Sequence, residues 1–345
     1  MAIEENITIK DIAKKSGVSV TTVSRVLNEK PDVNDQTRAK VLKIIEESNY
    51  RPNGMARSLV INQTYSIGLI IPDINNPYFP EVARGVEDQA QDSSYSVIFS
   101  STDNKLEREK DVIDLMLHKR VDGLIVSLSL ANRSILERLE AKNIPVVQLD
   151  RKIPDSIYPA VMIDNQRSAY KAVQFLIDQG YSNIAHITGD LKTVPGQERE
   201  DGYRKAILDN SLRFDEDLII EGDFSKKSGY KAMVKMIDEG NLPEAIFAAN
   251  DLMAIGVLEV CRERNIKVPE DLVIIGHDDI SIANLVYPSL TTMAQPKYKL
   301  GKKASQLLID LIEIKQRKGS LKAKDFFADQ VLETRLIRRE STTTK

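Results

Sequence analysis

Short apolar runs that alternate with amphipathic segments restrict the fold of this chain more than any other feature. The predicted strands are residues 67–71, 96–99, 123–127, 146–149, 160–163, 184–188, 245–249 and 273–276. The helical patterns between most of them are residues 78–93, 106–118, 166–179, 197–210, 225–239 and 251–264. Strands that alternate with helices form parallel sheets with helices on both faces. From Thr64 onward the sequence therefore predicts an α/β body with two doubly wound lobes.

Length and composition are those of a globular protein with several folding units. The 345 residues exceed what one hydrophobic core organises, and 42% hydrophobic with 29% charged residues excludes a largely disordered chain. No run approaches the roughly 18 apolar residues of a membrane span. The first residues include Glu4 and Glu5 and no apolar block, so they are not a secretory signal. The single cysteine, Cys261, fits a reducing compartment, and we expect a cytoplasmic protein without a membrane partner.

The amino-terminal segment has a different charge from the rest. Residues 1–62 hold ten Lys/Arg and eight Asp/Glu, a net charge of +2, whereas the remainder holds 38 and 43, a net charge of -5. This contrast is too small to indicate nucleic-acid binding by itself.

Three short helices are predicted in this segment. Thr8 is the N-cap of a helix over residues 9–15, which ends where Gly17 allows a tight turn. Ser19 is the N-cap of a second helix over residues 20–27. A third helix runs from after Asn34 to about Ser48. The predicted core of the segment consists of Val23, Val26, Leu27, Val41, Leu42, Ile44 and Ile45.

The second helix has a small polar outer face. Its outward residues are Val20, Thr21, Thr22, Ser24 and Arg25. Short polar or methyl-bearing side chains and one guanidinium suit base edges, thymine methyl groups and phosphates in a DNA major groove. The pattern predicts a helix-turn-helix unit, although other small helical domains share a glycine turn.

Several short motifs resemble the lactose/galactose repressor family of bacterial transcriptional regulators. The similar segments are Ile-Lys-Asp-Ile-Ala at 9–13, Gly-Val-Ser at 17–19, Thr-Val-Ser-Arg-Val-Leu-Asn at 22–28, Tyr-Arg-Pro-Asn at 50–53 and Ala-Arg-Ser-Leu at 56–59. The resemblance extends over nearly the whole chain and is most specific at the amino terminus.

The resemblance implies a dimeric repressor that binds a palindromic operator and is associated with the nucleoid. In that family, residues equivalent to 53–60 form a hinge helix on DNA, and Leu59 would wedge into the minor groove. Gly54 replaces a frequent alanine, which weakens an isolated hinge helix by about 1 kcal/mol. The alternative is a plain polar linker. The DNA-binding residues predicted are Thr8, Ser19, Val20, Thr21, Thr22, Ser24, Arg25, Asn28, Asn53, Ala56, Arg57 and Leu59.

The body of the family resembles periplasmic sugar-binding proteins, in which the chain crosses between lobes three times. We expect crossings near Asp164, Leu290 and Leu321. The expected domains are a helix-turn-helix domain at 1–49, a hinge at 50–62, a first lobe at 63–163 with 291–320, a second lobe at 164–290 with 321–340, and a disordered tail at 341–345.

Polar residues follow the predicted strands, where ligands bind in such sheets. Carboxylates, an amide and a guanidinium can bind paired hydroxyls, and an aromatic face can stack on a sugar ring. By resemblance the sugar-binding residues are Asp150, Arg199, Phe224, Asn250 and Asp278, with Phe79 as a weaker candidate. Acids after strands also cap the next helix, and Asp251 is expected to do so.

Enzymes, transport proteins and other regulators are the alternatives. The sequence has no dinucleotide-binding glycine motif, phosphate-binding Gly-Lys-Ser/Thr loop or Gly-x-Ser-x-Gly elbow. The histidines His118, His186 and His277 lack metal-ligand spacing, so we expect no catalysis, cofactor or metal. A sugar-binding protein of a transport system would need export. Regulation by a purine or with a phosphoprotein corepressor stays open, as does the sign of the ligand's effect.

Overall fold

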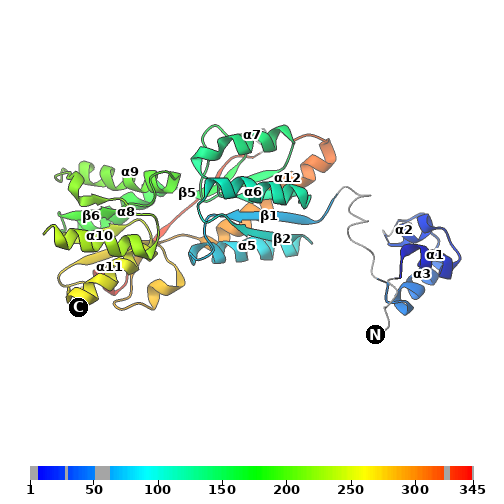
Figure 1. Ribbon diagram of the computed structural model, residues 1–345, viewed down its shortest axis with the longest axis horizontal. Helices are drawn as coiled ribbons and strands as arrows, with labels where there is room; N and C mark the ends of the chain where they lie inside the picture. Colours follow the sequence, from blue (N-terminus) through cyan, green and yellow to red (C-terminus); the bar gives the residue numbers. More distant parts are fainter. Residues whose placement is uncertain (1–6, 28–29, 51–62, 322–326, 344–345) are drawn as a thin grey trace. The chain divides into compact units, whose positions relative to one another are not determined.

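The computed structural model describes residues 7–27, 30–50, 63–321 and 327–343, apart from the side chain of Leu130, and contains two compact units, Met1–Thr64 and Tyr65–Lys345 (Figure 1). The first unit contains α1 (Ile9–Ser16), α2 (Val20–Leu27) and α3 (Asp35–Glu47). Its core is formed by Ile12, Val23, Val26 and Val41, each at most 2% exposed. The three predicted helices are therefore present and pack around one small core.

The caps of these helices follow from the sequence. The Asp11 carboxylate accepts hydrogen bonds from the Thr8 backbone N–H at 2.9 Å and from the Thr8 hydroxyl at 2.6 Å. Gly17 ends α1 with φ 66°, a conformation that favours glycine. Leu42 was predicted in the core but is 47% exposed, because the helical repeat that turns Val41 inward turns the next residue outward.

The second unit contains two six-stranded sheets. The first has the order β11-β5-β4-β3-β1-β2 and the second the order β12-β10-β9-β8-β6-β7. The first sheet consists of β1 (Ser66–Ile71), β2 (Ser96–Ser101), β3 (Gly123–Val126), β4 (Val146–Leu149), β5 (Ala160–Ile163) and β11 (Gln330–Leu332). The second consists of β6 (Ile184–Ile187), β7 (Ile219–Ile220), β8 (Ala245–Ala248), β9 (Val273–Asp278), β10 (Thr291–Ala294) and β12 (Arg335–Ile337). All pairs are parallel except β10 with β12.

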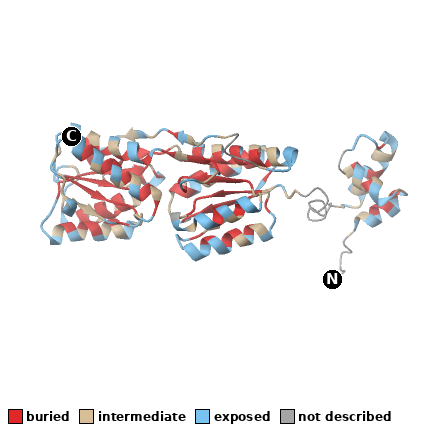
Figure 2. Ribbon diagram, turned by 90° about the horizontal axis from the view of Figure 1, so that it is seen from above, coloured by how far each residue is buried: buried red, intermediate tan, exposed pale blue. Residues whose placement is uncertain are grey.

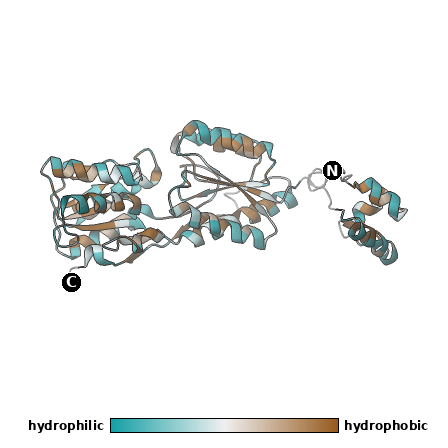
Figure 3. Cartoon of the chain, turned by 60° about the horizontal axis from the view of Figure 1, so that its bottom comes forward, coloured by the Kyte–Doolittle hydropathy of each residue, from teal (hydrophilic) through white to brown (hydrophobic). Residues whose placement is uncertain are grey.

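Helices cover both faces of each sheet (Figures 1 and 2). Around the first sheet, α5 (Tyr78–Asp92) pairs with α12 (Lys297–Lys318), and the other face packs on α6 (Leu106–His118) and α7 (Arg133–Ala141). Around the second, α8 (Asn165–Asp178) pairs with α9 (Val194–Asp209), and α10 (Lys226–Asp238) with α11 (Asp251–Arg264). The central strands of each sheet are buried and hydrophobic, whereas edge strands such as β2 are partly exposed (Figure 3). No helix in the described part of the chain is long and apolar enough to cross a membrane.

The predicted crossings near Leu290 and Leu321 lie too early in the chain. Strand β10 pairs with β9 in the second sheet, and β11 pairs with β5 in the first sheet. The chain therefore crosses after β10 and again between β11 and β12.

Residue 341 was predicted in a disordered tail, but Ser341 is fully buried. Its hydroxyl donates to the Ile274 carbonyl at 2.6 Å and accepts from the Thr291 N–H at 2.9 Å.

Candidate functional site

A cavity of about 330 Å³ lies between the two lobes, beyond the carboxyl ends of their strands. Its volume is at the lower end of the range for small-molecule sites. The first lobe contributes Pro72, Asp73, Asn75, Asn76, Tyr78, Phe79, Asn104, Asp150 and Arg151. The second lobe contributes Pro195, Arg199, Asp223, Phe224, Ser225, Lys226, Leu252 and Asp278, and the crossing segment contributes Gln295.

A chain of hydrogen bonds joins the lobes through this cavity. The Tyr78 hydroxyl lies 2.8 Å from Asp150 Oδ1 and 3.1 Å from Gln295 Oε1. Gln295 Nε2 donates to Asp278 Oδ1 at 2.7 Å. Tyr78 and Asp150 belong to the first lobe and Asp278 to the second. A ligand that contacts these hydrogen-bonded side chains therefore acts on both lobes at once.

Burial raises the pKa values of two of these hydrogen-bonded side chains, Tyr78 and Asp150. Desolvation raises the pKa of Tyr78 well above 10, and the carboxylates of Asp150 and Asp278 add to that rise. Desolvation also raises the pKa of Asp150, against the opposing effect of the nearby arginines. The Tyr78 phenol therefore stays protonated and acts as a donor near neutral pH.

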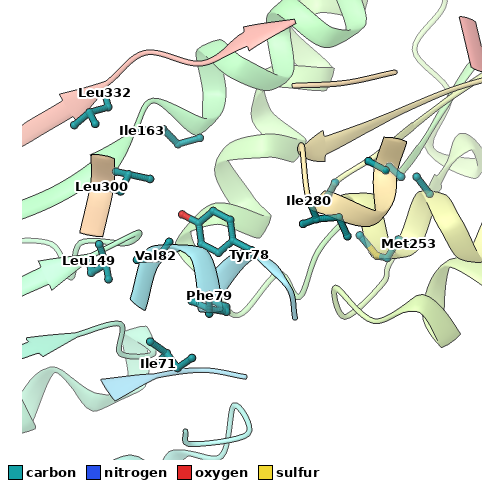
Figure 4. Close-up of a cluster of buried hydrophobic side chains, with 14 of the residues drawn as sticks. Ile71, Tyr78, Phe79, Val82, Leu149, Ile163, Met253, Ile280, Leu300 and Leu332 are labelled. Carbon is teal, nitrogen blue, oxygen red and sulfur yellow. The ribbon is translucent and has the colours of Figure 1, made fainter. Parts of the chain in front are cut away.

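Tyr78 and Phe79 extend from the first turn of α5 (Figure 4). Their rings meet edge to face, with centroids 4.9 Å apart. They belong to one buried cluster with Leu149 of the first lobe and Ile280 of the second. Phe79, a predicted ligand-binding residue, lines the cavity, and so does its neighbour Tyr78, which was not among the predicted site residues.

Arg199 is fixed by several contacts on the second lobe. Its Nε donates to Asn165 Oδ1 at 2.9 Å, and its Nη1 donates to the Ala249 carbonyl at 2.5 Å. Nη1 also lies 3.6 Å from Asp278 Oδ1. The side chain is 4% exposed, so this ion pair is desolvated and its orientation is set before any ligand arrives.

Phe224 forms an aromatic wall beside Arg199. The guanidinium carbon lies 5.9 Å from the ring centroid. The ring packs on Gly189, where an added Cβ would lie 1.9 Å from the ring Cζ. The wall thus depends on a glycine across from it, and a ring in this position can stack on a flat ligand face.

Asn250 was predicted as a ligand residue, but it is not among the residues that line the cavity. Its Nδ2 donates to the Phe224 carbonyl at 2.9 Å, and its Oδ1 accepts from the Met253 N–H at 3.0 Å. It therefore caps α11 and holds the Phe224 loop. The expectation that Asp251 caps this helix is wrong. The Asp251 carboxylate instead accepts from the Ile280 N–H and the Thr292 hydroxyl.

Strained backbone marks the same strand ends. Asp150, Phe224 and Asp278 have φ values of 69°, 65° and 112°. Such conformations cost about 1 to 3 kcal/mol each in residues other than glycine, and they concentrate at ligand-binding sites. All three residues line the cavity.

His277 is hydrogen-bonded to the Asp278 carboxylate. Its Nδ1 lies 3.0 Å from Asp278 Oδ1, and its Nε2 lies 2.8 Å from the Ser168 hydroxyl. Burial, with a further contribution from Arg199, lowers the pKa of His277 from 6.5 to about 4. The folded protein therefore keeps this imidazole neutral.

Stability should fall below pH 6.5 partly because of His277. The unfolded chain binds a proton at this residue as the pH drops from 6.5 to about 4, whereas the folded chain does not. The stability at stake is about 3 kcal/mol, present above pH 6.5 and lost toward pH 4. Urea unfolding of H277Q should show a shallower decrease over this interval. The exposed His118 supplies the control H118Q; an unchanged slope in H277Q would contradict the assignment.

Most of the predicted DNA-binding residues that the structure describes lie on the exposed surface of the first unit. Val20 is 41% exposed, and Thr8, Ser19, Thr21 and Arg25 are also exposed, whereas Thr22 and Ser24 are half-buried. The Ser19 hydroxyl accepts from the Thr22 N–H at 3.1 Å, as expected for an N-cap. Arg25 pairs with Asp32 at 3.0 Å. The predicted DNA contacts Asn28, Asn53, Ala56, Arg57 and Leu59 lie outside the described residues.

Sequence reasoning missed several residues that line the cavity. Gln295 follows β10, a strand that was not predicted, and Asn104 follows β2 after a short loop. Lys226 is the first residue of α10. A search for polar residues after every strand would have found Gln295 had the Thr-rich segment of β10 been recognised.

Comparison with known proteins finds a matching family description for each of the two units. Residues 8–53 match the family described as bacterial regulatory proteins, lacI family, and residues 173–342 match the periplasmic binding protein-like domain. The catabolite control protein A of Priestia megaterium is 40% identical over 304 residues, which are 88% of this chain and 92% of that protein.

Two solved structures are similar to this protein over nearly the whole of its chain. A lac repressor dimer bound to operator and the anti-inducer ONPF has a TM-score of 0.87 at 27% identity, covering 99% of this chain and 100% of that chain. The transcriptional regulator CelR in complex with cellobiose has a TM-score of 0.73 at 30% identity, covering 97% and 99%. The chain therefore belongs to the LacI family of bacterial regulatory proteins and is a DNA-binding transcriptional regulator.

Proposed function

We propose that this protein is a repressor whose affinity for a palindromic operator is controlled by a small sugar in the cavity between its lobes. The observation that carries the proposal is the hydrogen-bonded chain from Asp150 through Tyr78 and Gln295 to Asp278. It joins the two lobes at the place where a ligand would bind.

The cavity has the groups that polyols need. Asp150, Asp278 and Arg199 offer acceptors and donors for paired hydroxyls, and Phe79 and Phe224 offer aromatic faces. The similarity to a regulator solved with cellobiose supports this class of ligand. Asn250 enters the proposal as a residue that positions Phe224.

The segment that crosses between the lobes after β10 can couple the ligand cavity to the rest of the first lobe. Lys297, the first residue of α12, donates from Nζ to the carbonyls of Asp278 and Asp279 at 2.8 and 2.6 Å. It lies 3.4 Å from Glu81 of α5. A ligand that moves Asp278 thus also acts on α5 and α12 of the first lobe. A coupling of about 1 to 3 kcal/mol is enough to change operator occupancy several-fold or more.

The DNA-binding part of the proposal rests on the exposed face of α2 and on the segment 53–60 as a hinge. The domains proposed are the helix-turn-helix unit, the hinge and the two lobes, with the lobes delimited by the sheets. The similarity to the operator-bound lac repressor dimer supports this organisation. A cytoplasmic location is part of the same proposal.

The experiment begins with selection of duplexes by the full-length protein from a random library. Enriched duplexes should be palindromic, and their affinity, measured by fluorescence anisotropy, should change about tenfold or more with one saccharide of a panel of pentoses, hexoses and disaccharides. If no palindrome is preferred over random duplex, with or without saccharides, the proposal is wrong.

A dimer surface on the second lobe is part of this function. Leu285 and Tyr287, in the segment between β9 and β10, are 78% and 88% exposed, and Ile282 is 40% exposed. Adjacent exposed apolar side chains of this size mark an interaction surface. A second copy of the chain is the partner, because a palindrome presents two half-sites.

Y287D should therefore shift the protein from dimer to monomer and weaken operator binding by about tenfold or more, since a buried unpaired carboxylate is costly. Sedimentation velocity and anisotropy measure the two effects. Leu208 of α9 is 60% exposed on the same lobe, and L208D is the matched control. A dimeric Y287D with normal operator affinity would exclude this surface.

A further inference from the structure

Arg25 is the only charged residue of α2, the helix whose exposed face carries the proposed DNA contacts. Its side chain is 55% exposed. The exposed residues Val20 and Thr21 at the start of the helix are uncharged. A charge-assisted side-chain contact between this helix and a base or a phosphate therefore depends on Arg25.

A carboxylate is paired with this arginine. Arg25 Nη1 lies 3.0 Å from Oδ2 of Asp32, a residue between α2 and α3 whose side chain is 52% exposed. An exposed ion pair of this kind contributes little to stability. A negative charge beside a DNA-binding arginine also repels phosphates and lowers the affinity for DNA. Neither stability nor affinity therefore accounts for Asp32.

The segment that contains Asp32 is anchored before and after this residue. The Lys30 N–H donates to the Arg25 carbonyl at 3.0 Å, and the Lys30 carbonyl accepts from Arg38 Nη2 at 2.6 Å. Val33 is 9% exposed and belongs to the core of the first unit. Because the backbone is held on both sides, the ion pair with Asp32 gives the Arg25 guanidinium a defined direction.

The direction of a guanidinium decides what it binds. The ion pair engages Nη1 of Arg25, and the edge formed by Nε and Nη2 is not part of it. Two parallel donors match N7 and O6 of a guanine in the major groove. An arginine without such a restraint has many conformations and contacts phosphates of any sequence.

We propose that Asp32 is a positioning residue for operator specificity, which orients Arg25 toward a guanine and restrains it from the phosphates of other sequences. The inference rests on the proposed function, because that function places the exposed face of α2 on the operator. Asp32 thus lowers the affinity for DNA in general and raises the discrimination between the operator and random DNA.

Substitution D32N tests the inference in the full-length protein. Fluorescence anisotropy compares the palindrome enriched by selection with a shuffled duplex of the same length and composition. D32N should bind the shuffled duplex more tightly and the palindrome equally or more weakly. The ratio of the two affinities should fall about fivefold or more, since a bidentate contact to a base supplies discrimination of at least this size.

Two further measurements on D32N separate positioning from a structural role. The slope of log affinity against log salt for the shuffled duplex should steepen by about 0.9 for each arginine that gains a phosphate contact. The melting temperature should stay unchanged, because the ion pair is half-exposed. A clearly lower melting temperature, or an unchanged salt slope, would overturn the inference.

D35N is the matched control. Asp35 is the exposed first residue of α3, and it makes no ion pair with a described residue. D35N removes the same charge from the same region, so it should change both affinities by the same factor and keep their ratio. If D35N lowers the ratio as much as D32N does, net charge and not the ion pair sets the discrimination.

A double-mutant cycle shows whether Asp32 acts through Arg25. When Arg25 is already alanine, adding D32N should have no more effect on the ratio than D35N has. A further fivefold decrease in R25A/D32N relative to R25A would contradict the inference.

The failures of the two proposals differ. If R25A weakens binding to the palindrome but D32N keeps the ratio of the parent protein, Asp32 is not a positioning residue and the proposed function stands. If R25A binds the palindrome as tightly as the parent protein, the exposed face of α2 does not contact the operator. The DNA-binding part of the proposed function then fails, and the inference fails with it.

Discussion

Substitution of Arg199 by alanine is expected to weaken effector binding about a hundredfold or more and to leave operator affinity unresponsive to the effector. Arg199 lies between Asp278 and the Phe224 ring and is 3% exposed. Its loss removes the donor for ligand hydroxyls and leaves Asp278 buried without its cation. Titration calorimetry and anisotropy measure the two effects.

Stability should fall in the same variant. Removing one partner of a buried ion pair costs about 3 to 5 kcal/mol, which corresponds to a decrease in melting temperature of roughly 10 °C in a unit of this size. The double variant R199A/D278N removes the unpaired charge as well. It should recover much of the melting temperature but not the effector response.

R204A is the matched control for R199A. Arg204 lies on the same helix, α9, and pairs with Glu200 at 2.6 Å with 37% of its side chain exposed. Arg204 is not among the residues that line the cavity, so R204A should respond to the effector normally. A normal effector response in R199A would exclude Arg199 from the site.

The parts of the site that follow predicted strands could be located from sequence. Asp150 directly follows β4 and Asp278 is the last residue of β9, and the buried apolar residues of both strands make them easy to recognise. Since the carboxyl ends of parallel strands meet at one edge, their polar successors were expected to converge. The structure places both residues in the cavity.

Strand β10 could not be recognised in this way, and Gln295 was missed with it. Thr291 and Thr292 are fully buried in β10. Their hydroxyls have partners remote in sequence: Thr291 donates to the Arg339 carbonyl and Thr292 to the Asp251 carboxylate. A pattern of hydrophobic residues does not show which threonines find such partners, and so the crossing predicted near Leu290 was misplaced.

Asn250 illustrates a second limit of predicting site residues from sequence. The position after a parallel strand is also the N-cap of the next helix, so a capping side chain and a ligand-binding side chain occupy the same place in the sequence. Only the hydrogen bonds to Met253 and Phe224 separate the two roles.

Substitution of Gly301 by valine is expected to destabilise the first lobe by more than about 4 kcal/mol and to abolish effector binding. Helices α5 and α12 touch through two glycines. A Cβ at Gly301 would lie 2.0 Å from the Val82 carbonyl oxygen, and one at Gly85 would lie 2.1 Å from the Tyr298 carbonyl oxygen. Both obstacles are backbone atoms, so the helices would have to separate.

The separation would reach the site because both helices begin there. Tyr78 is the first residue of α5, and Gln295 lies two residues before α12. Their hydrogen bond at 3.1 Å requires the two helix starts to stay in place. Loss of this contact would interrupt the chain of hydrogen bonds between the lobes even in molecules that remain folded.

Thermal unfolding and titration calorimetry measure these effects, with K302V as control. Lys302 is the next residue on α12 and is exposed, so valine there should cost only about 0.5 kcal/mol through its lower helix propensity. Because the helix-turn-helix unit has its own core, G301V should keep nonspecific DNA binding. If G301V melts like K302V and still binds the effector, close contact of α5 and α12 is not what positions Tyr78 against Gln295.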